Sequence, residues 1–164
     1  MKRAPALVRL SWDHHHGLVM ARRIAREVPS ADAEALGELY SDLLRFWSAG
    51  LLPHFRAEGE CMLARLVRHV RADHAAVQRL HADHLEMESL VATMRDNQDL
   101  EARREALLAF GRTLYDHIRW EERDLFQLVQ DSLESGEMTS LQADLDEALP
   151  DIDSAAAPAG DGGA

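Results

Sequence analysis

Two histidine–glutamate pairs in this sequence have the spacing to bind a metal ion. The 164 residues include nine histidines, among which His54 is followed four residues later by Glu58 and His117 by Glu121. Four residues of α-helix turn through about 400°, so His54 shares a helical face with Glu58, and His117 shares one with Glu121. Imidazole nitrogens and carboxylate oxygens suit iron, manganese and zinc.

Of the aspartate–histidine pairs in the sequence, two alternate with these motifs along the chain. Asp13-His14 precedes the first histidine–glutamate pair, and Asp83-His84 lies between the first and the second. The motif order is therefore DH, HxxxE, DH, HxxxE, which indicates two similar helical hairpins. We interpret Asp13 and Asp83 as residues that orient or solvate their neighbours rather than as ligands.

Four helical segments are predicted to position these motifs. Apolar residues recur at steps of three and four over about residues 6–27, 31–70, 73–94 and 100–133, and each apolar stripe contains one of the histidines. Pro53 lies inside the second segment and predicts a kink near Ala49–Gly50 or, alternatively, two helices that meet at Pro53. Ser135–Gly136 is predicted to end the fourth segment, and a short terminal helix follows at about Thr139 to Leu149.

This pattern predicts an all-α fold. Four long amphipathic helices with short connections pack most simply as an antiparallel up-down-up-down four-helix bundle. Residues 1–149 are expected to form this single domain. Residues 150–164 have the sequence PDIDSAAAPAGDGGA, which is expected to be a disordered acidic Ala/Gly/Pro tail.

Composition and charge exclude several classes of function. The chain has 18 Lys and Arg against 29 Asp and Glu, a net charge of −11, which argues against nucleic acid and anionic membranes as partners. The single cysteine, Cys61, allows no intrachain disulfide and no cysteine-based zinc cluster. There is no apolar run long enough to span a bilayer and no signal-peptide core near the N-terminus, so we expect a cytoplasmic protein.

Six ionisable side chains are predicted to face the interior of the bundle. Burying them is costly unless they are paired or bind an ion, and they are too many for one four-coordinate zinc. A lone histidine on an apolar stripe is usually a core residue, but histidines on all four stripes together indicate a dinuclear site bridged by carboxylates. The predicted ligands are His14, His54, Glu58, His84, His117 and Glu121.

The motifs also resemble a known family. The segments LSWDHHHGLVMARRI, LLPHFRAEGE, ADHLEMESL and LYDHIRWEERDLF are similar to the four helices of hemerythrin-like, HHE cation-binding domains, over about residues 7–130. The resemblance implies a non-haem di-iron centre inside the bundle that binds dioxygen or related small ligands. It implies the same six ligands.

The third and fourth helices depart from the oxygen-carrying members of that family. Those proteins have a His-x3-His pair on the third helix, whereas Leu80 stands four residues before His84 here. On the fourth helix they have Asp five residues after the histidine, whereas here a glutamate comes at four. These differences argue against reversible oxygen carriage. Further candidate ligands are His81 and Glu88 on the third helix, and His15 as a rival to His14.

The predicted function is therefore a binding protein with two iron ions, manganese or zinc being alternatives, that binds dioxygen, nitric oxide or peroxide, or acts in iron or redox sensing. A redox or signalling partner is not indicated by the sequence. One alternative is a di-iron oxidase or peroxidase, although the Glu-x-x-His motif of ferritin-like enzymes is absent. The other is a helical interaction module with structural histidines.

Several other residues are predicted to have structural roles only. Glu122 is expected to be solvated, and Cys61 to be a small core residue. His69 and His74 are expected on the surface. Six of the large aromatic residues are predicted to pack in the core or to form pocket walls: Trp12, Phe46, Trp47, Phe55, Trp120 and Phe126.

Overall fold

The computed structural model describes residues 3–96 and 99–149. These residues form helices and contain no β-strand, which confirms the all-α class. The predicted tail, residues 150–164, and residues 97–98, between the predicted third and fourth segments, lie outside the described residues. In the order of the chain, the elements are α1 (Pro5–Glu27), a 3-10 turn (Val28–Ser30), α2 (Ala33–Phe46), α3 (Leu52–Ala57), α4 (Ala64–Leu66), α5 (Ala75–Asp96), α6 (Leu100–Trp120), α7 (Phe126–Ser132) and α8 (Ser135–Ala148).

Two of the long helical segments contain π-helical turns, in which the helix widens. The segment from α2 to α4 is interrupted at Trp47–Leu51 and again at Glu58–Leu63, and the segment from α6 to α7 is interrupted at Glu121–Leu125. The helix continues through Pro53, and a π turn covers the residues where the sequence predicts a kink. The bend itself stays a prediction.

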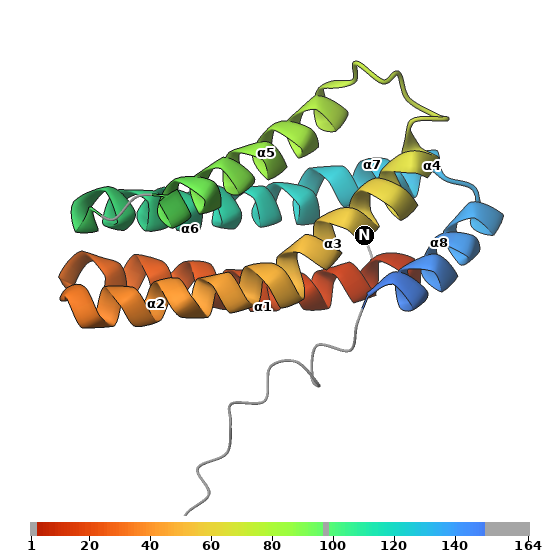
Figure 1. The fold of residues 1–164 in the computed structure, drawn as a ribbon. Helices are drawn as coiled ribbons and strands as arrows, with labels where there is room; N and C mark the ends of the chain where they lie inside the picture. The colour runs from red at the N-terminus through yellow and green to blue at the C-terminus, as the bar shows by residue number, and fades with distance from the viewer. Residues whose placement is uncertain (1–2, 97–98, 150–164) are drawn as a thin grey trace, which may run out of the picture.

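Figure 1 shows the long helical segments side by side, with α8 beside the start of α1. Helix α1 packs closely against α6, and α5 also packs closely against α6. A Cβ atom on Gly111 would lie 2.8 Å from Ile24 Cγ2, so this glycine permits the close approach of α6 to α1.

The apolar core consists of two clusters separated along the bundle. One cluster joins the start of α1 to α7 and α8, and includes Leu7, Phe126 and Leu141. The other joins the end of α1 to α2 and α6, and includes Ile24 and Phe110. On each long segment, the predicted ligand residues lie where residues of one cluster give way to residues of the other. The bundle therefore has a polar layer between two apolar ones.

The C-terminal helix begins earlier than predicted. Ser135–Gly136 does not end a helix but lies in the first turn of α8, so the predicted break is wrong by about two residues. The chain leaves the helical conformation at Leu133 and Glu134 instead. The reason is a capping box, in which the Glu134 side chain accepts from the backbone of Glu137 and the Glu137 side chain accepts from the backbone N–H of Glu134 at 3.2 Å.

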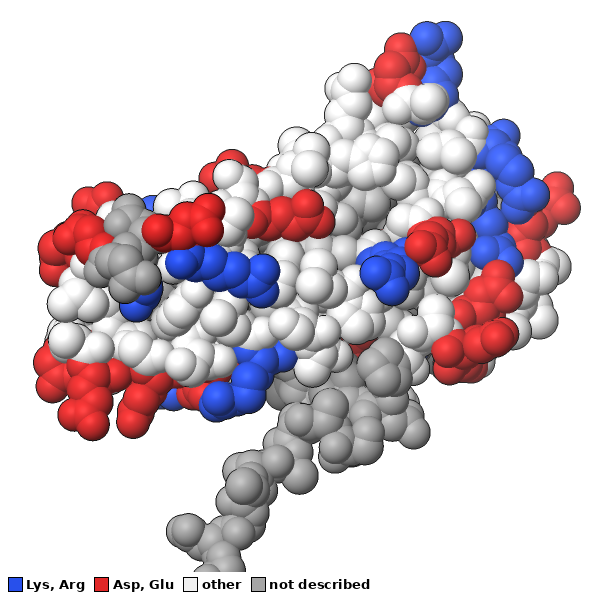
Figure 2. Space-filling view, viewed as in Figure 1, with Lys and Arg blue, Asp and Glu red and all other residues white. Residues whose placement is uncertain are grey.

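Charged side chains of both signs lie on the surface. Figure 2 shows acidic side chains gathered near the ends of the bundle and basic side chains scattered among them. Trp12 is 63% exposed, so the prediction that it packs in the core or forms a pocket wall is wrong. It lies on the outer side of α1, beside the buried Asp13 and His14. Among the described residues, no helix has the length and apolar content needed to cross a membrane.

Candidate metal centre

The six predicted ligands lie together in the polar layer. His14 comes from α1, His54 from α3, His84 from α5 and His117 from α6, while Glu58 and Glu121 each begin a π-helical turn. They form two groups of four, in each of which the candidate ligand atoms lie within 4.8 Å of one another. We call these the first ligand group (His14, His54, Glu58, Glu121) and the second ligand group (His84, His117, Glu58, Glu121).

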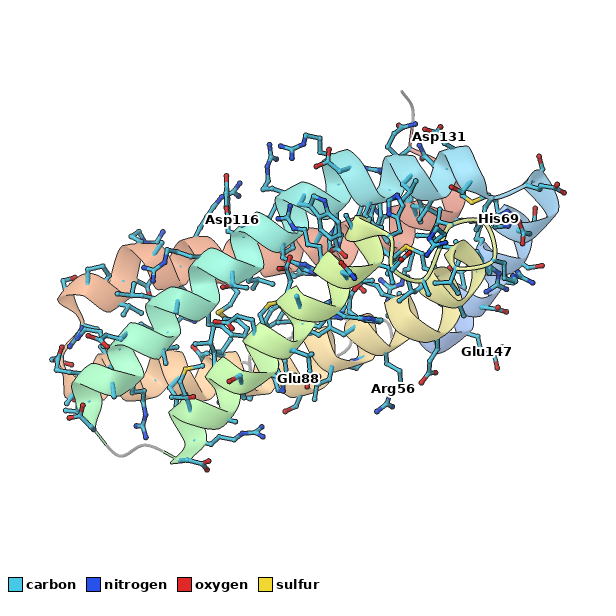
Figure 3. All side chains as sticks on the ribbon, turned by 90° about the horizontal axis from the view of Figure 1, so that it is seen from above. Arg56, His69, Glu88, Asp116, Asp131 and Glu147 are labelled. Atoms are coloured by element: carbon cyan, nitrogen blue, oxygen red, sulfur yellow. The ribbon has the colours of Figure 1, made fainter. Side chains whose placement is uncertain are left out.

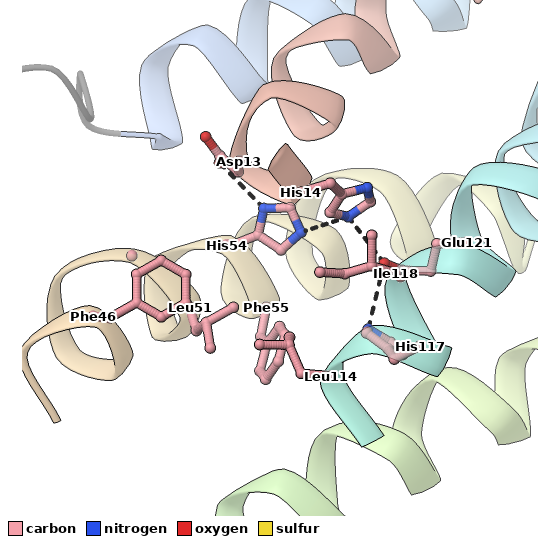
Figure 4. A pocket seen from close by; sticks show the side chains of 11 residues that line it. Asp13, His14, Phe46, Leu51, His54, Phe55, Leu114, His117, Ile118 and Glu121 are labelled. Atoms are coloured by element: carbon pink, nitrogen blue, oxygen red, sulfur yellow. Dashed lines mark hydrogen bonds and ion pairs between the residues drawn. The ribbon is translucent and has the colours of Figure 1, made fainter. Parts of the chain in front are cut away.

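In the first ligand group, two histidine nitrogens and two carboxylate oxygens converge. His14 Nε2 lies 3.2 Å from His54 Nε2. Glu121 Oε2 lies 3.0 Å from His14 Nε2, and Glu58 Oε1 lies 3.0 Å from His54 Nε2. Figure 4 shows these imidazoles turned toward one another from different helices. This is a compact set of nitrogen and oxygen donors of the kind that binds a transition metal.

The second ligand group repeats this arrangement with the other two histidines. His84 Nε2 lies 3.2 Å from His117 Nε2 and 3.2 Å from Glu58 Oε2. Glu121 Oε2 lies 3.4 Å from His117 Nε2. Glu58 therefore presents Oε1 to one pair of histidines and Oε2 to the other. Glu121 also contacts a histidine of each pair. Both carboxylates occupy positions between the two groups.

The carboxylates of the polar layer are buried without hydrogen-bonded partners. Glu58 and Glu121 are 0% exposed, and none of their four carboxylate oxygens accepts a hydrogen bond of good geometry. Histidine nitrogens lie 3.0–3.4 Å from three of these oxygens but make no hydrogen bond to them. Buried charge of this kind is costly unless it is paired or coordinated, so the residues present fit metal ions.

Two aspartates orient the histidines of the neighbouring helices. Asp13 Oδ2 lies 3.2 Å from His54 Nδ1, and Asp83 Oδ2 lies 3.1 Å from His117 Nδ1. An Nδ1–H group that donates to a carboxylate leaves the Nε2 lone pair free to face the interior, which is the usual second contact of a metal-binding histidine. The interpretation of these aspartates as orienting residues therefore agrees with the geometry.

The two halves of the chain build this support in the same way. Arg9 precedes Asp13 by four residues and contacts it at 3.1 Å, and Arg79 precedes Asp83 by four residues and contacts it at 3.4 Å. The repeated unit is thus RxxxDH followed by HxxxE. In each half, the aspartate beside one histidine holds the other histidine of the same half.

Glu122 has a role that the sequence analysis missed. It is half-buried rather than solvated, and its Oε1 accepts from His14 Nδ1 at 2.7 Å. Its other carboxylate oxygen and its backbone carbonyl both accept from the Arg3 guanidinium. The only local signal was its position directly after Glu121. The contacts that hold it come from residues more than a hundred positions away.

Histidine and glutamate side chains of the polar layer stabilise one another's charged forms. Burial alone would lower the pKa of His54, but the Glu58 and Asp13 carboxylates outweigh it and raise this pKa to about 9. Burial would raise the pKa of Glu58, but the surrounding histidines, His54 first, hold it well below its usual range. Burial would also raise the pKa of Glu122, but its hydrogen bonds with His14 and Ser11 lower this pKa to about 2. The pKa values of His14 and His117 are raised as well, so in the metal-free protein protonated imidazoles face the ionised Glu58.

A small cavity of about 10 Å³ adjoins the first ligand group. Beyond the ligands, its walls are mainly apolar and come from α2, α3 and α6, as Figure 4 shows. A space of this size suits one very small molecule. Those apolar wall residues are Phe46, Leu51, Phe55, Leu114 and Ile118.

The additional candidate ligands lie outside both groups. His15, His81 and Glu88 are exposed, and Figure 3 shows Glu88 on α5 away from the cluster of interior side chains. His69, also labelled there, is exposed as predicted and contacts Glu137 at 2.7 Å. Cys61 is a buried free thiol in the core cluster of α1, α7 and α8, which agrees with its predicted role.

Comparison with known proteins identified one family. The family described as "Hemerythrin HHE cation binding domain" matches residues 7–156, which is most of the chain. Searches of curated proteins and of solved structures gave no significant match.

Proposed function

The chain belongs to the hemerythrin HHE cation-binding family, and on that premise we propose that it holds two iron ions and uses them to bind dioxygen, nitric oxide or peroxide, or to sense iron or redox state. Manganese and zinc are alternative ions because they accept the same ligands. The proposed ligands are the members of the two ligand groups: His14, His54, Glu58, His84, His117 and Glu121.

The position of Glu58 is the observation that supports two ions most directly. Its two oxygens face different histidine pairs, at 3.0 Å from His54 and 3.2 Å from His84. A carboxylate that served a single ion would present its oxygens to one set of donors. A structural role for the histidines, the alternative without metal, leaves the buried oxygens of Glu58 and Glu121 without hydrogen-bonded partners.

The surrounding residues support the binding of a small, weakly polar ligand. Bound iron would supply a reversible change of oxidation state and a coordination position for the ligand. Leu114, Ile118 and Leu51 border the cavity beside His14 and His54, and they exclude bulk water from it. The net charge of −11 favours such a ligand over nucleic acid or an anionic membrane, and we propose a cytoplasmic location.

Metal analysis combined with optical spectroscopy tests this proposal. Protein purified without an affinity tag and loaded anaerobically is expected to hold two ferrous ions per chain and to develop a near-ultraviolet charge-transfer band on exposure to air. Glu58→Gln should lower the metal content and abolish the band. Glu60→Gln, which changes an exposed glutamate in the same π turn, should alter neither.

Two outcomes would contradict the proposal. Only trace metal after anaerobic loading would favour the interaction module with structural histidines. Repeated turnover of peroxide or of an organic reductant, far beyond one event per centre, would favour the di-iron oxidase or peroxidase instead.

A further inference from the structure

The two ligand groups are supported unequally by the residues around them. In the first ligand group, both histidines have a carboxylate at Nδ1, since Glu122 lies 2.7 Å from His14 and Asp13 lies 3.2 Å from His54. In the second ligand group, Asp83 supports His117 at 3.1 Å. No carboxylate among the described residues supports the Nδ1 atom of His84.

The supports of the first ligand group are themselves held in place. Arg3 contacts Glu122 and lies over the ring of Phe126, 4.7 Å from its centre. Phe126 in turn stacks on the His14 ring, with 5.3 Å between ring centres. The N-terminal segment is tied to the same region by the Ala4 backbone N–H, which donates to Gln130 at 2.6 Å. His14 is therefore restrained both at its nitrogen and at its ring face.

His84 lies in a more open environment. Its side chain is 13% exposed, against 4% for His14, 3% for His54 and 1% for His117. It borders a surface groove between α3 and α5, and its ring is held mainly by stacking on Phe55, with 3.8 Å between ring centres. Of the four histidines, His84 has the least restraint and the shortest route to solvent.

We propose that the two metal positions differ in exchange, and that the ion of the second ligand group leaves and enters first, beside His84 through the groove between α3 and α5. This inference rests on the proposed function. Residues that hold a metal-binding histidine in place typically change metal affinity by about 10–100-fold. The ion of the second ligand group should therefore dissociate at least about ten times faster than that of the first.

Release of zinc to a chelator tests the inference without depending on iron chemistry. The full chain is loaded with two equivalents of Zn²⁺ and mixed with an excess of a chromogenic chelator. We expect one equivalent to be released rapidly and the second at least about ten-fold more slowly. Far-ultraviolet circular dichroism of each variant verifies that the fold is retained.

Matched variants of the repeated aspartates assign the two phases. Asp83→Asn should accelerate the rapid phase alone, and Asp13→Asn should accelerate the slow phase alone. Asp116→Asn, which changes an exposed residue of α6, should affect neither phase. Acceleration of only the rapid phase by Asp13→Asn would overturn the assignment.

The outcomes separate this inference from the proposed function. A chain that retains neither iron nor zinc refutes both. Two ions released in one phase with equal rates refute the inference and leave the proposed function intact. If the chain retains only one ion, loss of this ion in His14→Ala together with its retention in His84→Ala supports the inference. Loss of the ion in His84→Ala together with its retention in His14→Ala refutes it.

Discussion

Replacement of His54 by alanine tests whether the buried carboxylates and histidines stabilise one another and bind metal together. The His54 side chain is 3% exposed and lies 3.0 Å from Glu58, 3.2 Å from Asp13 and 3.2 Å from His14. Its removal leaves Glu58 Oε1 without its nearest nitrogen. Asp13 keeps its contact with Arg9, and Glu58 Oε2 keeps its contact with His84.

The expected loss of stability follows from these contacts. Removing one partner of a buried ion pair costs about 3–5 kcal/mol. The lower end, about 3 kcal/mol, applies to the metal-free protein because both carboxylates retain one partner. Metal at one hundred times its dissociation constant stabilises a folded protein by about 2.7 kcal/mol, and the variant should lose this increment for the affected ion. The total difference in the presence of metal is then about 6 kcal/mol.

Urea unfolding, followed by circular dichroism, measures both quantities. The wild-type chain and His54→Ala are compared with metal and with a chelator, and metal content is determined in parallel. His15→Ala is the matched control, since His15 is exposed and should leave stability and metal content nearly unchanged. Full metal content with an unchanged unfolding midpoint in His54→Ala would refute the reasoning.

Two further predictions concern pH and packing. The pKa of His54 is raised to about 9 in the folded protein. Its contribution to the free energy of unfolding is therefore complete below its pKa in the unfolded chain, near 6.5, and is lost as pH rises to about 9. Because the pKa of Glu58 is lowered in the folded protein, its contribution to the free energy of unfolding is lost as pH falls below about 4.5. The metal-free protein should therefore be most stable at about pH 4.5–6.5. A urea midpoint in chelator that rises between pH 6.5 and 9 would contradict this, whereas stabilisation by added metal should grow over that range because ligands must lose their protons. Gly111→Ala should destabilise the fold by about 1–3 kcal/mol, because its Cβ would lie 2.8 Å from Ile24 Cγ2 and 3.2 Å from Ile24 Cβ. In Gly37→Ala the new Cβ meets no atom within 4 Å, so this variant should be neutral or more stable by up to about 1 kcal/mol, and equal melting temperatures for the two variants would count against this packing argument.

The helical class and the convergence of the six predicted ligands could be predicted because both follow from local spacing. An apolar stripe at steps of three and four fixes which side of a helix is buried, and His54 and Glu58 share that side whatever the neighbouring helices do. The repeated DH and HxxxE motifs indicated two similar helical hairpins. Ser135–Gly136 shows the limit of such rules, since a capping box at Glu134 moved the start of α8.

The role of Glu122 and the exposure of Trp12 could not be predicted from spacing. Glu122 follows Glu121 directly, and its function depends on His14 and Arg3, which are distant in sequence. Trp12 is 63% exposed because it lies on the outer side of α1, contrary to its predicted place in the core or in a pocket wall. The π-helical turns that begin at Glu58 and Glu121 also lack a signal in composition, although such turns are frequent at functional sites.

The division of ligands between the halves of the chain has a consequence for its connectivity. Each ligand group takes both histidines from one half and carboxylates from both halves, so each bound ion would act as a cross-link between two hairpins. The connection between them, residues 67–74, supplies no ligand and is largely exposed. Coordination would thus make this stretch of backbone dispensable, and two fragments produced by cleavage there would reassemble around the ions.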